Sequence, residues 1–367
     1  MHYRKKFTEI AILLVINTAI FVIIFLAYVV VTIEDPHAHM GIQRKIQSIY
    51  QNDPYTGYTI RPNLAADMPI TPDTAYSLYT DIRGVRVTAA GEHGPANPQV
   101  VVIGDSQSFG MGVSNDQTYP YALSRKLGVP VANLSVPGYS TVAALRRLEN
   151  FGDFHPKIVI LGHYYDHPRR NINTCSPAFA VFNCITVPYL AKTSDGTFDV
   201  REPRDNQFAL RQVASYFDYV TGQGPAYSWW LDYFWWGLRR TRDIFETLRL
   251  VNFYPYKEPI DPGVAEVTTR MLFERLRNQA AAMGARPVVL YIPDYLGTEV
   301  VPAPAYLART ARDLEIPLVD ATGDIRDIKE QDPDHLSVPN DGHLQGPPHR
   351  RIAHLLAERI RVLGLLN

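Results

Sequence analysis

The chain has 367 residues, of which 46% are hydrophobic and 20% are charged, and its formal net charge is −1. This composition is typical of a globular protein with a sizeable core and excludes a largely disordered chain. No basic stretch is interleaved with aromatic residues, so we do not expect a nucleic-acid partner.

An apolar run at about residues 10–32 follows a basic cluster at residues 4–6. About 20 helical residues suffice to cross the ~30 Å hydrocarbon core of a bilayer. A cleaved signal peptide would have a shorter apolar region and a small-residue exit, which residues 29–35 do not offer. We therefore predict that residues 1–35 are a cytoplasmic tip and a single-pass helix held by inner-membrane lipid. The rest of the chain would lie on the periplasmic, extracytoplasmic side. The alternative, a buried core helix, seldom has so long an apolar run.

The two cysteines, Cys175 and Cys184, bracket eight residues. Outside the cytoplasm they can form a disulfide, and closing a loop of about 10 residues stabilises the fold by ~2–3 kcal/mol in the chain-entropy model. The alternative is a pair of buried free thiols. No further cysteine or histidine at metal-ligand spacing accompanies them, so we do not expect a zinc site.

The remaining chain divides at about residue 98. Residues 36–97 are rich in Pro, Asp and Tyr, with short strand-like pieces such as 57–60, and we interpret them as a juxtamembrane lead-in. In residues 98–367 strands alternate with helices, which predicts a parallel sheet with helices on both faces. The predicted strands are 99–103, 129–134, 157–162, 286–292 and 316–320, and the predicted helices are 119–127, 141–151, 268–283 and 349–363.

An aromatic-rich insertion at about 167–265 interrupts this alternation. Connections between strands and helices usually have 2–6 residues, so this segment is too long for one. Three interpretations stay open. The aromatic side chains form the insertion's own core, they contact the membrane interface or a membrane protein partner, or they line a pocket for an acyl group or a glycan. The insertion holds all four tryptophans, Trp229, Trp230, Trp235 and Trp236.

Two short motifs carry the side chains that serine-based acyl transfer needs. Gly-Asp-Ser at 104–106 follows the first predicted strand, where open parallel sheets place reactive groups. Asp-Gly-His at 341–343 follows the last strand. A serine hydroxyl needs a histidine to take its proton, and that histidine needs a carboxylate to hold its tautomer. Each motif alone is weak, but together they predict Ser106 as nucleophile, His343 as base and Asp341 as the residue that orients it.

These motifs resemble the blocks of the SGNH (GDSL-type) hydrolase family, and the resemblance covers most of the predicted outward-facing part. It implies a flavodoxin-like three-layer α/β/α sandwich whose five-stranded parallel sheet has the order 2-1-3-4-5. Ser106 and the segment 164–166 would then border the crevice between strands one and three. The blocks lie at 104–110, 133–141 and 341–345 with His349, and the segments 53–58, 61–63 and 83–86 are similar to the lead-in of membrane-anchored members.

The resemblance also implies an oxyanion hole made by the N–H groups of Ser106 and Gly138 and by an asparagine side chain. In the third block, at 161–166, Tyr165 stands where that asparagine is expected. Loss of such a donor costs ~3–4 kcal/mol of transition-state stabilisation in other enzymes. The Tyr165 hydroxyl is the predicted replacement, with His163 or Asn171 as alternatives. Two donors only, weak activity or a changed substrate class also stay open.

We therefore predict a membrane-anchored serine esterase or O-acyltransferase that needs no cofactor and no metal. Its substrate would carry ester-linked acyl groups, such as O-acetyl, on an extracytoplasmic glycan or lipid. The competing prediction is a catalytically weak or inactive subunit that docks in a membrane protein complex through its tryptophan-rich insertion.

Overall fold

The computed structural model describes residues 12–22, 48–71, 74–176, 185–203, 260–339 and 341–366. The chain divides into two units, of which one comprises residues 1–43 and 226–253. In that unit only a helix at 12–22 is described, and it lies within the predicted membrane anchor. No helix of the described residues is long and apolar enough to cross a membrane. The rest of the anchor lies outside the described residues, so the anchor stays a prediction.

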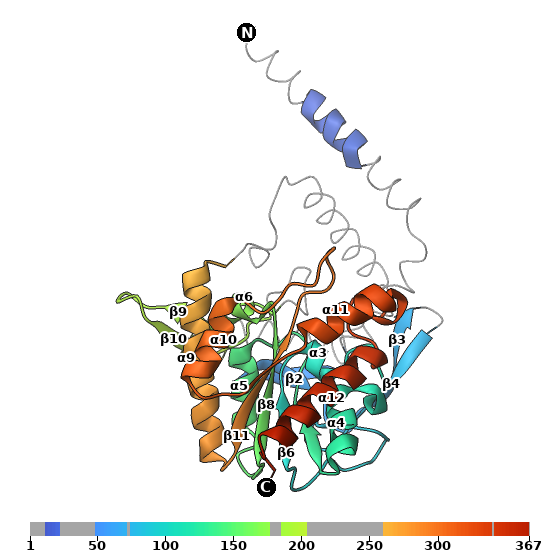
Figure 1. Cartoon of the computed structure of the whole chain (residues 1–367). Helices are drawn as coiled ribbons and strands as arrows, with labels where there is room; N and C mark the ends of the chain where they lie inside the picture. Colours follow the sequence, from blue (N-terminus) through green and yellow to red (C-terminus); the bar gives the residue numbers. More distant parts are fainter. Residues whose placement is uncertain are drawn as a thin grey trace, which may run out of the picture. The chain divides into compact units, whose positions relative to one another are not determined.

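A five-stranded parallel sheet forms the centre of the second unit (Figure 1). Its spatial order, β12-β11-β8-β6-β7, is the predicted order 2-1-3-4-5 taken from the opposite edge. Every residue of β6 and β8 is buried, as expected for central strands that helices cover on both faces. The strands are β6 (Val100–Ile103), β7 (Val131–Asn133), β8 (Ile158–Tyr164), β11 (Arg286–Ile292) and β12 (Leu318–Asp320).

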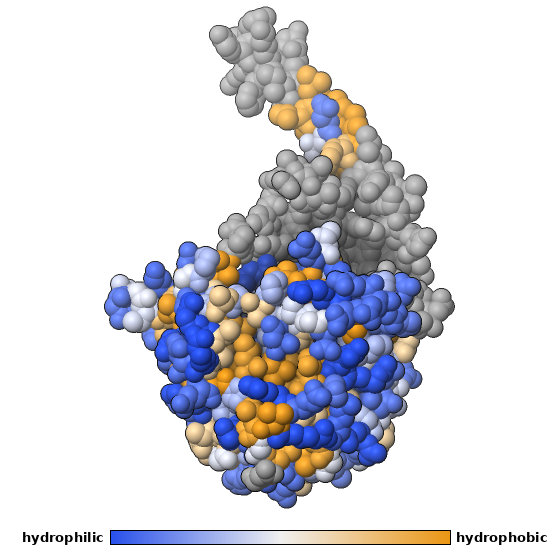
Figure 2. Space-filling model, viewed as in Figure 1, coloured by the Kyte–Doolittle hydropathy of each residue, from blue (hydrophilic) through white to orange (hydrophobic). Residues whose placement is uncertain are grey.

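A buried hydrophobic cluster lies on each face of this sheet. Side chains alternate along a strand, so Val101 and Ile103 join one cluster, whereas Val100 and Val102 join the other. Hydrophilic side chains gather over α9 and α11 on the outside (Figure 2). The first cluster includes residues of α5 (Thr141–Glu149), α9 (Pro262–Ala282) and α10 (Ala305–Asp313), and the second includes residues of α4 (Tyr119–Leu127), α11 (Thr322–Gln331) and α12 (Gly346–Val362).

Local signals account for the ends of these helices. The side chain of Thr118 caps α4, and Gly128, at φ 68°, ends it as predicted. Helix α9 begins six residues before the predicted start, because Pro262 fits its first turn and Asp261 caps it. Helix α12 likewise begins at Gly346 rather than at 349, since two prolines occupy its first turn, where no N–H partner is needed.

The lead-in folds together with the sheet. Tyr58, Met68 and Leu78 are fully buried in the cluster that contains Val101 and Ile103. This segment therefore supplies part of the core beside the sheet. Its strands are the paired β1 (Tyr50–Asp53) and β2 (Gly57–Ile60), and the antiparallel β3 (Ala65–Thr71), β4 (Thr74–Thr80) and β5 (Arg86–Val87).

The described part of the insertion contains helix α6 (His167–Asn171) and a hairpin of β9 (Tyr189–Lys192) and β10 (Phe198–Arg201). Residues 177–184 and 204–259 lie outside the described residues. They contain all four tryptophans and Cys184. The roles of the aromatic residues and the disulfide between Cys175 and Cys184 therefore stay predictions.

Candidate active site

Ser106 is the first residue of α3 (Ser106–Phe109), a four-residue helix just after β6. The carboxylate of Asp105 caps this helix and accepts a hydrogen bond from the Gln107 N–H at 3.0 Å. Ser106 is 8% exposed. Its own N–H has no intrahelical acceptor and makes no hydrogen bond to another described residue, so it is available as a donor.

Close packing explains the glycines beside this turn. A Cβ atom at Gly104 would lie 2.6 Å from the Oγ of Ser108 and 2.9 Å from the carbonyl oxygen of Gly162. A Cβ atom at Gly162 would overlap the same Ser108 side chain. The Tyr119 hydroxyl donates to the Oγ of Ser108 at 2.9 Å and holds it there. Without side chains at Gly104 and Gly162, α3 lies directly against β8.

Asp341 and His343 pair in the loop that precedes α12. The Nδ1 atom of His343 is hydrogen-bonded to the carboxylate of Asp341, and each side chain is 24% exposed. Gly342 between them has a φ of 82°, which favours glycine. Burial raises the pKa of Asp341, but its hydrogen bond with His343 and the charge of that ring outweigh burial, so the pKa lies below its usual value. Nε2 is then the ring nitrogen that can take a proton from a nucleophile.

The side chain of Gln107 links the two motifs. Its Oε1 atom accepts a hydrogen bond from the buried N–H of Leu344 at 3.3 Å. The Tyr295 hydroxyl, just after β11, also donates to the carbonyl of Gly342 at 2.8 Å. These bonds hold the predicted nucleophile and base at the same edge of the sheet. The described residues show no hydrogen bond from the Ser106 hydroxyl to His343, and such bonds often tighten only when substrate binds.

The loop after β7 lies beside the nucleophile turn. The N–H of Val136 donates to the carbonyl of Gly104 at 3.1 Å. Gly138 in this loop has a φ of 80°. Its N–H makes no hydrogen bond to another described residue. The loop that contains Gly138 is therefore bonded to the turn that contains Ser106, and the Gly138 N–H is available as a second donor.

No protein-family model and no curated protein matches the chain. Solved structures give weak likenesses. A protein assigned to the G-D-S-L family from Desulfitobacterium hafniense DCB-2 is 12% identical and covers 71% of this chain and 99% of its own, with a TM-score of 0.35. LAE5, an α/β hydrolase from the Lake Arreo metagenome in Spain, is 16% identical and covers 74% and 97%, with a TM-score of 0.38. A family two carbohydrate esterase from Clostridium thermocellum, solved with cellohexaose, is 11% identical and covers 76% and 68%, with a TM-score of 0.38.

The fold is therefore described from the strand order and the site. Ser106 follows the first strand of a 2-1-3-4-5 sheet, and the Asp341–His343 pair precedes the last helix. The fold is an α/β fold with a five-stranded parallel sheet in the order that the resemblance to the SGNH (GDSL-type) hydrolases implies.

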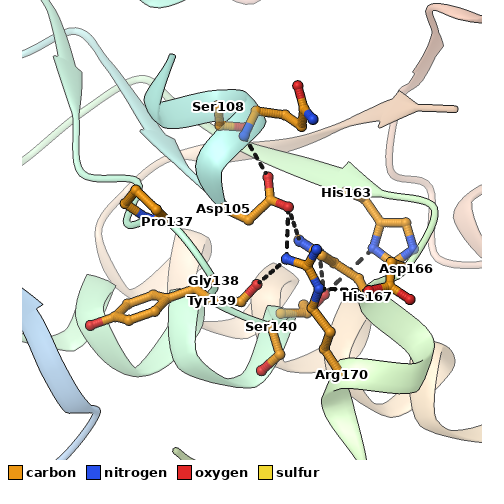
Figure 3. Close-up of polar contacts among 12 residues, drawn as sticks. Asp105, Ser108, Pro137, Gly138, Tyr139, Ser140, His163, Asp166, His167 and Arg170 are labelled. Atoms are coloured by element: carbon orange, nitrogen blue, oxygen red, sulfur yellow. Dashed lines mark hydrogen bonds and ion pairs between the residues drawn. The ribbon is translucent and has the colours of Figure 1, made fainter. Parts of the chain in front are cut away.

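A buried charge network lies beside the nucleophile turn (Figure 3). Asp105 is fully buried, and its Oδ2 atom lies 3.0 Å from Nη1 of Arg170 and 3.6 Å from Nε2 of His167. Arg170 also binds Asp166 at 2.8 Å and donates to the carbonyl of Tyr139 at 3.3 Å. Helix α6 therefore ties together the loops after β6, β7 and β8. The sequence does not indicate this network, because Asp105 and Arg170 are 65 positions apart in the chain.

Burial raises the pKa of Asp105, but the nearby His167 ring and the charge of Arg170 outweigh burial, so the pKa lies below its usual value. Burial lowers the pKa of Arg170, and the charges of Asp166 and Asp105 more than reverse this effect. Both charges are therefore paired where an isolated charge would be costly. The described residues contain no cluster of histidine, cysteine and carboxylate side chains suited to a metal ion.

Tyr165 follows β8 directly and departs from the SGNH pattern. Its N–H donates to the carbonyl of Ile292 at 3.0 Å, and its ring packs edge-on against Tyr164 at 4.6 Å. The residue is 36% exposed, and its hydroxyl makes no hydrogen bond to another described residue. Burial and the nearby carboxylates of Asp294 and Asp166 raise its pKa. The phenol therefore keeps the proton that a hydrogen-bond donor needs.

The two alternative donors are both buried beside α6. His163 is buried, with its ring against His167 at 5.1 Å and against Phe273 at 5.6 Å. Burial and the charge of His167 hold its pKa well below the usual value. Asn171 is also buried, and its Oδ1 accepts a hydrogen bond from the N–H of Val142 on α5 at 3.3 Å. The Nδ2 atom of Asn171, its donor, is buried without a hydrogen-bond partner among the described residues, so the three candidate donors stay a prediction.

Proposed function

We propose that the chain is a serine esterase or O-acyltransferase that forms an acyl-enzyme on Ser106. The observation that carries the proposal is the hydrogen bond between Gln107 and Leu344. It joins the nucleophile turn to a loop in which Asp341 already holds His343 by Nδ1. Nucleophile, base and orienting carboxylate are the three groups that acyl transfer to serine requires.

In the reaction, Ser106 Oγ attacks the ester carbonyl while Nε2 of His343 takes its proton. The carboxylate of Asp341 stabilises the imidazolium that forms. The N–H groups of Ser106 and Gly138 bind the oxyanion of the tetrahedral intermediate. His343 then gives its proton to the leaving alkoxide, and the acyl group stays on Ser106. Water or an acceptor hydroxyl, deprotonated by His343, takes the acyl group and restores the serine.

We further propose that the Tyr165 hydroxyl is the third oxyanion donor. Support comes from its place at the end of β8, next to the loop that follows β6 in the sheet order. Its hydroxyl has no partner within the described residues, and its pKa is raised, so it retains a proton to donate. A phenol and an amide both supply one polar hydrogen to an oxyanion.

As substrate we propose ester-linked acyl groups of an extracytoplasmic glycan or lipid, reached by an enzyme anchored in the inner membrane. Support comes from the apolar run at 10–32 and the basic cluster before it. The described part of that run is a helix with exposed apolar side chains. The full chain should stay in the membrane fraction after alkaline carbonate extraction, and a chain that begins at residue 36 should be released. Release of the full chain would contradict the anchor.

The catalytic proposal is tested with the full chain in detergent micelles. We expect p-nitrophenyl acetate hydrolysis and labelling by a serine-reactive fluorophosphonate, with both lost in Ser106→Ala. Ser77→Ala is the matched control, because Ser77 lies on β4 and its hydroxyl bonds only the exposed Asp67. Equal rates in the wild type and Ser106→Ala, with no labelling at Ser106, would contradict the proposed catalysis. That result would favour the alternative function, a subunit that docks in a membrane protein complex.

The same assay separates hydrolysis from transfer. Both reactions share every step up to the acyl-enzyme and differ in whether the site excludes water. With a soluble oligosaccharide present, a transferase releases p-nitrophenol in excess of free acetate. A hydrolase releases the two in equal amounts.

A further inference from the structure

A strand of the lead-in contacts the loop that carries the predicted oxyanion donor. The hydroxyl of Tyr58 on β2 donates to the carbonyl oxygen of Pro137 at 2.8 Å, and Tyr58 is fully buried. That carbonyl belongs to the same peptide group as the N–H of Gly138. The lead-in therefore binds one end of a peptide whose other end is the proposed oxyanion donor.

We propose that Tyr58 is a positioning residue that orients and polarises the Gly138 N–H, so that the lead-in completes the oxyanion hole. This inference rests on the proposed function, because an oxyanion hole has a role only if Ser106 attacks a carbonyl. It assigns to residues 57–60 a part in catalysis in addition to their part in the core.

Peptide geometry gives the first reason. A trans peptide group is planar, and its C=O and N–H bonds point in opposite directions. A hydrogen bond that fixes the direction of the Pro137 carbonyl therefore fixes the direction of the Gly138 N–H. The position needs this restraint, because glycine has more backbone freedom than any other residue and Gly138 has a φ of 80°.

Polarisation gives the second reason. A carbonyl that accepts a hydrogen bond draws electron density from its peptide nitrogen, which strengthens the N–H as a donor. Ser176 extends the chain of bonds, with its Oγ 2.7 Å from the Tyr58 hydroxyl. The Oγ atom of Ser176 also lies 3.5 Å from the carbonyl oxygen of Gly138. Burial raises the pKa of Tyr58 well above its usual value, so the hydroxyl keeps its proton at any working pH.

Further bonds fix β2 to both sides of Gly138. The Tyr139 hydroxyl donates to the carbonyl of Tyr58 at 2.6 Å, and the two rings meet edge to face at 5.4 Å. The buried Arg147 of α5 binds the Thr59 hydroxyl and donates to the carbonyl of Leu134 at 2.7 Å. The lead-in and the loop after β7 therefore hold each other from Leu134 to Tyr139.

The test compares Tyr58→Phe with the wild type, using full-length chain in detergent and rates normalised to the active sites that a fluorophosphonate titrates. We expect kcat for p-nitrophenyl acetate to fall about tenfold, less than the ~100- to 1,000-fold loss when a whole donor is removed. KM should not change. The inhibition constant of a trifluoromethyl ketone, whose adduct carries the oxyanion, should rise by the same factor as kcat falls. A merely structural role would lower the number of titrated sites and leave kcat per site unchanged.

Tyr76→Phe is the matched control, since Tyr76 is a buried lead-in tyrosine whose hydroxyl contacts the Met111 sulfur at 3.2 Å. If Tyr58→Phe yields no titratable sites, Ser176→Ala is measured instead. We expect kcat and the inhibition constant each to change two- to threefold, because the hydrogen bond between Ser176 and the Tyr58 hydroxyl is lost. An active wild type with unchanged constants in the measured variant overturns the inference alone. A wild type without Ser106-dependent turnover overturns the proposed function and this inference with it.

Discussion

The side-chain oxygen of Gln107 accepts a hydrogen bond from the backbone N–H of Leu344, 237 positions later in the chain, at 3.3 Å. Gln107 follows the proposed nucleophile, and Leu344 follows the proposed base. This one buried bond therefore sets the relative position of two segments from opposite ends of the domain.

Replacement of Gln107 by leucine should separate these segments. The N–H of Leu344 would be left buried without an acceptor, which costs ~1–3 kcal/mol of unfolding free energy. We expect kcat per titrated site to fall about tenfold, because an error of about 1 Å in position can cost ~100-fold. Urea unfolding and p-nitrophenyl acetate kinetics measure the two effects.

Gln331→Leu serves as the control, because Gln331 is an exposed residue at the end of α11. Surface changes of this kind alter stability by about 0.5 kcal/mol or less. A Gln107→Leu enzyme with wild-type kcat would show that the bond does not set the catalytic geometry.

The Asp341–His343 pair should act as one unit with Ser106. We expect His343→Ala and Asp341→Asn each to lower kcat by ~1,000- to 10,000-fold, since the base or its tautomer is lost. Groups that act together are not additive, so the double variant should lose no more than His343→Ala alone. Additive losses in the double variant would contradict a shared role.

A second aspartate–histidine pair offers a matched control. Asp332 and His335 are 2.7 Å apart, and their side chains are 54% and 60% exposed. Asp332→Asn and His335→Ala should leave kcat unchanged, because these residues lie on the surface before the catalytic loop. The Asp→Asn and His→Ala substitutions are thus the same at both pairs, and only the place of the pair in the fold differs.

Tyr165→Phe tests the third oxyanion donor. The substitution keeps the ring against Tyr164 and removes only the hydroxyl. We expect kcat to fall by ~10- to 100-fold with little change in KM, because an oxyanion donor acts in the transition state. Tyr189→Phe, on the hairpin strand β9, is the control. Unchanged kcat in Tyr165→Phe would leave two backbone donors as the whole oxyanion hole.

The sheet was predictable because each of its strands is a short apolar run followed by a helix signal. The order 2-1-3-4-5 came from the resemblance and is confirmed. Helix starts were less predictable. Helices α9 and α12 begin earlier than predicted, because the prolines at 262, 347 and 348 occupy their first turns.

The network around the site was not predictable, since it depends on pairs far apart in the chain. Arg170 reaches Asp105 across 65 positions, and Tyr58 reaches Pro137 across 79. Nothing in the local pattern at 167–171 or 57–60 distinguishes a buried partner from a surface residue. The close packing of Gly104 and Gly162 against Ser108 depends in the same way on the sheet already being formed.

The buried charge of Asp105 should make stability depend on pH. The pKa of Asp105 is lowered in the folded state, so its contribution is fully present above the unfolded value of ~3.9 and is lost as pH falls through the folded value. Asp105→Asn leaves Arg170 with one buried partner fewer and should cost ~3 kcal/mol at pH 7. The difference in unfolding free energy between variant and wild type should stay constant from pH 7 to about 5 and narrow below about pH 4. Urea unfolding followed by circular dichroism measures it.

Asp153→Asn is the control, because Asp153 pairs with Arg83 with its side chain 65% exposed and water screens that pair. A gap that persists unchanged to pH 3, or is absent at pH 7, would mean that the Asp105 carboxylate does not stabilise the nucleophile turn by its charge.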